Sequence, residues 1–110
     1  MTPTARTLAY CKKHGLKVAN ASWWNSFARR RMDTFGMLDL WAWYPGSRTL
    51  VGVQVCAGSS HAARRKKIRE NEWYPRLIAV GIPIEVWSWS KCGARGKRKT
   101  WELRREAVEG

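Results

Sequence analysis

The chain has few acidic residues, few histidines and no long apolar run. Its 110 residues include eight Asp or Glu and two His, against 21 Lys or Arg. The three cysteines, Cys11, Cys56 and Cys92, are widely spaced and form no Cys-x-x-Cys pair, which argues against a zinc site or a disulfide framework and suits a reducing compartment. Because no apolar stretch reaches membrane-spanning length, we expect a soluble, cytoplasmic protein without a membrane partner.

What the chain has in excess is positive charge, a formal +13. Charge of this density disfavours a compact state by self-repulsion unless a polyanion is near, and here it is gathered in blocks. Nucleic acid is therefore the expected partner, and the alternative is a protein that is merely basic. The residues expected to contact nucleic acid are Arg29, Arg30, Arg31, Ser59, Ser60, Arg64, Arg65, Lys67, Lys97, Arg98 and Lys99.

Tryptophan is also abundant, with eight residues in a chain of this length. A core of this size does not need so many, so some are expected at the surface. Stacking on bases is one use for a surface tryptophan, whereas filling the space between a sheet and its helices is the commoner one. Trp87 and Trp89 are assigned to the core.

The length fits one domain, residues 1–110, and the apolar periodicity predicts an α/β fold with a mixed central sheet flanked by helices. Residues 25–32 and 91–99 are expected to be loops, and residues 102–110 a frayed terminus. Val80 is expected on the buried side of the last helix, and His61 in the first turn of a helix, where it could contact a phosphate. Helices are predicted at 3–14, 61–71 and, with Pro75 as a kink or a new start, 70–80. Strands are predicted at 16–21, 35–44, 49–56, 82–89 and 100–104.

Asp39 is one of only two aspartates, and it lies inside an apolar run. A carboxylate among Trp and Leu side chains is costly to bury unless it binds something. With the hairpin turn at residues 45–48, antiparallel pairing places Trp41 opposite Gly52. The same register places Asp39 opposite Gln54, so the sequence predicts a polar pair inside an apolar sheet.

The expected element order, α-β-β-β-α-β, resembles that of the PD-(D/E)XK nuclease superfamily, which includes restriction endonucleases and Holliday junction resolvases. The run Phe35-Gly36-Met37-Leu38-Asp39-Leu40, followed by Gln54-Val55-Cys56, is similar to small phage-type members of this group. The resemblance implies a restriction-endonuclease-like fold, Mg²⁺ or Mn²⁺ as cofactor, and a bacterial host cell if the protein is phage-encoded.

The resemblance also implies roles for individual residues. Gln54 and Cys56 occupy the positions where the superfamily usually has Glu and Lys, and a lysine of the following helix is the candidate to replace that lysine. Asp33 is a candidate second carboxylate. The implied catalytic residues are Asp39, Gln54, Cys56 and Lys66, and the implied metal ligands are Asp39, Gln54 and Val55, the last through its carbonyl oxygen.

The sequence thus predicts a metal-dependent DNA endonuclease or junction-resolving nuclease, for which a homodimer is also expected because two strands must be cut symmetrically. The missing Glu and Lys leave a second hypothesis, a catalytically inactive DNA-binding module on the same fold. A third is a small RNA-binding structural protein.

Overall fold

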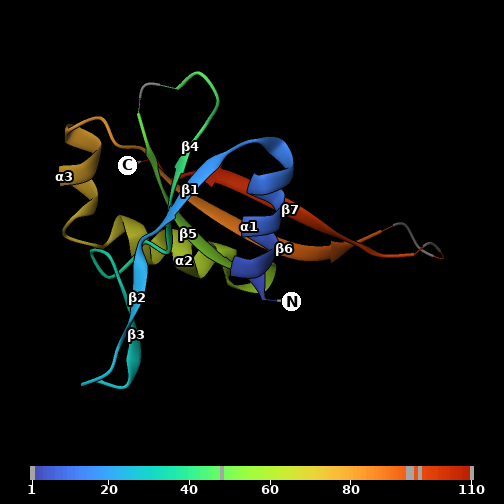
Figure 1. Cartoon of the computed structure of the whole chain (residues 1–110), viewed down its shortest axis with the longest axis horizontal. Coiled ribbons are helices and arrows are strands. Elements are labelled where there is room, and N and C mark those ends of the chain that lie inside the picture. Colours follow the sequence, from blue (N-terminus) through green and yellow to red (C-terminus); the bar gives the residue numbers. More distant parts are fainter. Residues whose placement is uncertain (1, 48, 94–95, 97, 110) are drawn as a thin grey trace.

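The computed structural model describes residues 2–47, 49–93, 96 and 98–109, with Arg31 described by its backbone alone. A mixed five-stranded sheet in the order β1-β4-β5-β6-β7 forms the centre, and a separate two-stranded sheet pairs β2 with β3 (Figure 1). In chain order the elements are α1 (Pro3–His14), β1 (Lys17–Asn20), β2 (Ser22–Asn25), β3 (Arg30–Asp33), β4 (Leu40–Trp43), β5 (Val51–Ala57), a 3-10 turn (Gly58–Ser60), α2 (His61–Arg69), α3 (Tyr74–Ala79), β6 (Ile84–Cys92) and β7 (Thr100–Ala107).

The first helix forms as its end signals predict. The Thr2 hydroxyl oxygen accepts a hydrogen bond from the Ala5 N–H (3.1 Å), and Pro3 occupies the first helical position. Gly15 ends the helix with φ +73°, a left-handed conformation that glycine adopts without a steric penalty. Capping chemistry therefore determines both ends of α1.

The sheet is covered on both faces, which confirms the predicted α/β class with flanking helices. On one face Val51, Val53 and Val55 of β5 belong to an apolar cluster that includes Cys11 of α1. On the other face Cys56 belongs to a cluster with residues of α2 and α3. Strand β5 is the central strand, antiparallel to β4 and parallel to β6, so it reads as a continuous apolar run.

The predicted hairpin register is confirmed, but its first strand is shorter than predicted. Trp41 pairs with Gly52 as expected. The chain before β4 is a tight turn and not a strand, since Phe35 and Gly36 have positive φ angles of 56° and 74°. Because this turn breaks the alternation, Leu38 lies on the same side of the sheet as Gly52, and its methyl groups fill the space above that glycine.

Residues 25–32 are not the predicted loop. They form the tip and second strand of the β2–β3 hairpin, in which Trp23 pairs with Met32 and Trp24 with Arg31. The pattern hid these strands because neither face of the hairpin carries an alternating apolar row. Figure 1 shows the hairpin projecting from the end of the sheet.

The two helices between β5 and β6 also differ in detail from the prediction. A turn separates α2 from α3, so Pro75 marks a new start. Tyr74 and Leu77 provide the buried side of α3, whereas Val80 is exposed. The helical run ends one residue before Val80, so that residue no longer follows the helical phase.

The C-terminal segment is ordered and not frayed. Strand β7 runs antiparallel to β6 as far as Ala107, and the next residue, Val108, is buried. The Val108 N–H donates to the Ile84 carbonyl oxygen (2.8 Å), and its carbonyl accepts from the Tyr74 hydroxyl (2.7 Å). The hydrogen bonds between β7 and β6 outweigh the polar composition that suggested fraying.

Three further expectations concern cysteines, tryptophans and membranes. Cys11, Cys56 and Cys92 are free thiols. Trp87 and Trp89 are buried in the core, as predicted. No helix in the described part of the chain is long and apolar enough to cross a membrane.

Candidate functional site

Asp39 lies just before β4, where the chain leaves the turn and joins the sheet. One of its carboxylate oxygens, Oδ2, accepts hydrogen bonds from Gln54 Nε2 (2.7 Å) and from the Val55 backbone N–H (2.8 Å). The Asp39 backbone N–H donates to the Val53 carbonyl oxygen (2.9 Å), which holds the residue against β5. The predicted Asp39 and Gln54 pair is therefore present, with two hydrogen bonds to the carboxylate and one from the backbone.

The second aspartate of the chain is beside the first. Asp33 ends β3, close enough to Asp39 to act on the pKa of its carboxyl group. Burial is the main cause that raises the pKa of Asp39 from its ordinary 3.8 to about 6. The charge and hydrogen bond of Asp33 add to the rise, against the Val55 N–H and the Arg64 charge, which lower it. Two carboxyl groups thus share one partly buried site.

The positive charge of Arg64, on α2, lowers the pKa of both Asp39 and Cys56. Arg64 was predicted as a nucleic-acid contact; it is half-buried, and its charge acts on both residues. Lys66, the predicted substitute for the missing lysine, is exposed and pairs with Glu70 at 4.0 Å. The helical phase explains the difference, because residues two apart on a helix face different directions.

Cys56 lies two residues after Gln54 on β5 and is buried. Burial raises the pKa of its thiol above the ordinary 9.0, and the Asp39 charge adds to this. The thiol is therefore neutral near pH 7, and it cannot supply the positive charge of a lysine.

The donor set bears on the expected Mg²⁺ or Mn²⁺. Both ions prefer oxygen ligands, which the Asp33 and Asp39 carboxylates offer. Gln54 turns its amide nitrogen toward Asp39, and the Val55 N–H is used in the same way, so these residues orient Asp39. Among the described residues no group of three or more His, Cys, Asp or Glu lies where it could hold a metal ion. Two carboxylates fit a Mg²⁺ ion that keeps several waters.

The predicted nucleic-acid contacts fall into three places. Arg29 and Arg30 are exposed on the β2–β3 hairpin, where Arg31 pairs through its backbone with Trp24. The second place is α2 with the 3-10 turn before it, and the third is the connection between β6 and β7. Ser59, Ser60, Arg64, Arg65 and Lys67 belong to the second place, Arg98 and Lys99 to the third, and Lys97 lies outside the described residues.

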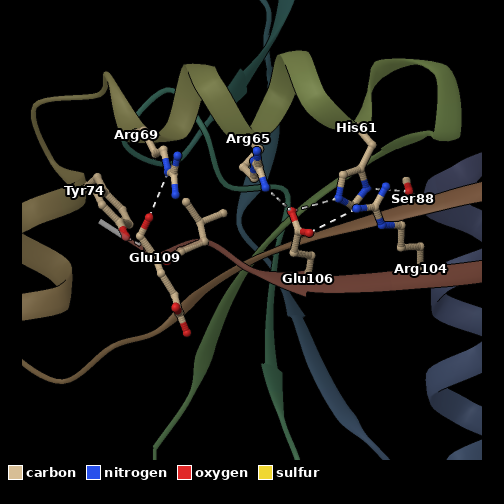
Figure 2. Close-up of polar contacts among 9 residues, drawn as sticks. His61, Arg65, Arg69, Tyr74, Ser88, Arg104, Glu106 and Glu109 are labelled. Atoms are coloured by element: carbon tan, nitrogen blue, oxygen red, sulfur yellow. Dashed lines mark hydrogen bonds and ion pairs between the residues drawn. The ribbon is translucent and has the colours of Figure 1, made fainter.

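A second polar cluster, which the sequence analysis missed, joins α2 to β6 and β7 (Figure 2). His61 is buried, with Nδ1 at 2.6 Å from the Ser88 Oγ and Nε2 at 3.3 Å from Glu106 Oε1. Arg65 and Arg104 also donate to the Glu106 carboxylate, at 3.2 and 3.1 Å. His61 is the first residue of α2, as predicted, and it is buried among these partners.

The order hydroxyl, imidazole, carboxylate is that of an activated serine, but the surroundings indicate a structural role. Ser88 is only 2% exposed and His61 4%, so a substrate has little access to either. Glu106 is committed to two arginines, and its pKa is lowered: burial raises it, but the contacts with His61 and Arg65 outweigh that. The cluster is a clamp between helix and sheet. One sequence signal for this cluster was available. Ser88 is a polar residue two positions after Val86, on the same face of the predicted strand, and Glu106 lies in the segment that pairs with this strand.

Comparison with known proteins gives no match, whether to a protein family, to a curated protein or to a solved structure.

Proposed function

We propose that this protein is a metal-dependent DNA endonuclease or junction-resolving nuclease of the PD-(D/E)XK kind, with the acid pair of Asp33 and Asp39 as its reactive centre. The observation that carries the proposal is this carboxyl pair, beside Arg64, in a chain with a net charge of +13. A carboxyl group with a strongly raised pKa in a polar cluster is typical of functional sites.

The arrangement of the elements supports the same proposal. Without the β2–β3 hairpin and the final strand β7, the remaining order is α1, β1, β4, β5, the α2 and α3 segment, and β6. This reduced order is similar to the α-β-β-β-α-β order that the resemblance implies, which supports the proposal. Asp39 immediately precedes the second of these core strands and Gln54 lies in the third, as the resemblance requires.

In this proposal each residue has a task set by its contacts. Gln54 and the Val55 N–H hold one oxygen of Asp39 and so fix the orientation of its carboxylate. Asp33 offers the second carboxylate, and Arg64 binds the phosphate. A Mg²⁺ or Mn²⁺ ion at the two carboxylates would polarise the phosphodiester and lower the pKa of a bound water. The basic surface supplies affinity for the DNA backbone.

A catalytically inactive DNA-binding module is the second candidate, and it too has a specific observation in its favour. The position equivalent to the motif lysine carries the buried, neutral thiol of Cys56. Lys66, the expected replacement, is engaged with Glu70. The acid pair would then be a remnant that costs stability without supporting cleavage.

The deciding experiment incubates the protein with supercoiled, single-stranded and four-way DNA, each with Mg²⁺ or Mn²⁺ and with EDTA. The test variants are Asp39→Asn and Asp33→Asn, which remove charge but preserve side-chain size. The matched control is Lys13→Ala, which removes the charge of an exposed lysine of α1. We expect cleavage by the parent and by the control, and its loss in both Asn variants.

Cleavage that survives Asp39→Asn would refute the assignment of the site. Absence of cleavage by the parent with every substrate and metal, together with DNA binding that weakens steeply with salt, would favour the inactive module. A structured RNA competitor that displaces DNA would favour the RNA-binding alternative. Metal binding has its own readout, since Mn²⁺ should raise the melting temperature of the parent but not of Asp39→Asn. For junction resolution, sedimentation should show a homodimer.

A further inference from the structure

The β2–β3 hairpin carries three aromatic side chains that are more than half exposed to solvent. Trp23 is 52% exposed, Trp24 63% and Phe27 100%. Large aromatic surfaces that stand in water at one place usually mark an interaction site.

The hairpin is held in a defined conformation at both ends. At its tip the Asn25 side-chain oxygen accepts hydrogen bonds from the N–H groups of Phe27 (3.0 Å) and Ala28 (3.1 Å), and Arg29 adopts φ +50°. At its base the Ala21 N–H donates to the Asp39 carbonyl oxygen (2.9 Å), and the Thr34 N–H donates to the Ala21 carbonyl oxygen (2.8 Å). The hairpin that carries the aromatic side chains is thus hydrogen-bonded at its base to the backbone of Asp39.

The charge of the hairpin identifies the kind of occupant. Residues 22–32 contain three arginines and no acid. Exposed Trp side chains on one strand with arginines on the other suit a ligand that combines negative charge with flat aromatic faces. A nucleic acid strand with accessible bases is such a ligand. Intact duplex offers the charge but keeps its base faces stacked inside.

The register relates the hairpin to the proposed centre. Ser22 pairs with Asp33, and Trp24 pairs with Arg31. Because side chains two apart on a strand share a face, Trp24 lies on the same face of the hairpin as Asp33, about 7 Å further along. Trp23 lies on the opposite face. A strand bound at the acid pair and running along the hairpin would meet Trp24 next.

We propose that Trp24 stacks on an unpaired base beside the phosphate held at Asp33 and Asp39, so that the substrate is DNA with unpaired or unstacked bases, such as a flap, a junction or a single strand. The position of the base relative to the cleaved phosphate rests on the proposed function; the preference for unpaired bases does not. The aromatic hairpin provides selectivity, and the basic residues provide general affinity.

The test measures binding in EDTA, by fluorescence anisotropy, to labelled single-stranded, flapped and intact duplex DNA of equal length. Trp24→Ala should weaken binding to the first two about tenfold, the scale of one stacked base, and binding to duplex less than twofold. Trp24→Phe, which keeps an aromatic face, should restore most of the loss. Trp101→Ala is the matched control, since Trp101 is also exposed but stacks under Arg6 at 3.8 Å. An unchanged melting temperature confirms that Trp24→Ala folds.

Equal losses on intact duplex, no loss at all, or an equal loss in Trp101→Ala would overturn the inference. So would binding to phosphatidylglycerol vesicles that depends on Trp24, without any preference for unpaired bases. The two proposals fail separately. If the parent never cleaves DNA but shows the Trp24-dependent preference for unpaired bases, the proposed nuclease function is wrong and this inference stands. If the parent cleaves DNA without that preference, the proposed function stands and this inference is wrong.

Discussion

Replacing Asp39 by asparagine should stabilise the protein at neutral pH and have little effect near pH 4. Asparagine has the shape of aspartate, and its side-chain oxygen can take the place of Oδ2 as acceptor for Gln54 Nε2 and the Val55 N–H. Its amide group can donate to the Asp33 carboxylate. The substitution therefore removes the buried charge and the repulsion but keeps the hydrogen bonds.

The size and sign of the effect follow from the pKa of Asp39, which burial and the neighbouring Asp33 raise from 3.8 to about 6. A raised pKa means that the native state holds the proton more tightly than the unfolded state. The associated stability is fully present below about pH 4 and is lost as the pH rises to about 6 and above. At about 1.4 kcal/mol per pKa unit the full loss would be about 3 kcal/mol. Because Asp39 is only partly buried and solvent screens it, we expect about 1–2 kcal/mol.

The assay is urea denaturation of the parent and of Asp39→Asn at pH 4, 5, 6, 7 and 8. The free energy of unfolding of the variant should exceed that of the parent by an amount that grows between pH 4 and 7 and is then constant. Asp39→Ala provides the contrast, because it leaves the Gln54 amide and the Val55 N–H without their acceptor and should cost about 1–3 kcal/mol at every pH. A difference between parent and Asp39→Asn that does not change with pH would refute the reasoning.

Three other predictions concern the packing around the sheet. Tyr74→Phe removes the donor to the buried Val108 carbonyl and should lower the free energy of unfolding by about 1–2 kcal/mol in urea denaturation; an unchanged value would show that the C-terminal segment is not held there. Glu106→Gln should lower the melting temperature, and because the pKa of Glu106 is lowered, the loss should shrink as the pH falls below about 4; a loss that is constant with pH would contradict the ion-pair account. Gly52→Ala places a methyl group 2.9 Å from Ile84 Cδ1 and should cost about 1–3 kcal/mol by calorimetry, whereas a stabilised variant would show that the space is open.

Local rules in the sequence were enough for several elements. Thr2 and Gly15 mark the ends of α1 by capping chemistry, and the turn at residues 45–48 together with strand alternation yields the pairing of Trp41 with Gly52. The apolar residues on both faces of the segment 37–44 predicted a sheet covered by helices. These results depend on neighbours in sequence or on a single hairpin, so periodicity and turn chemistry determine them. The nuclease function, the metal and DNA as partner stay predictions.

The tertiary structure alone decided which distant residues meet. Asp33 reaches Asp39 because β3 returns to the base of the sheet, and the phase of α2 selects Arg64 rather than Lys66 as the neighbouring cation. The clamp of His61 and Glu106, which are 45 residues apart in the chain, requires α2 to pack on the face of the sheet that the paired strands β6 and β7 form. Such contacts depend on how helices and strands pack in space, and no local propensity records that. The sequence by itself thus determined the hairpin register and the pairing of Asp39 with Gln54, whereas packing determined which further side chains lie beside Asp39.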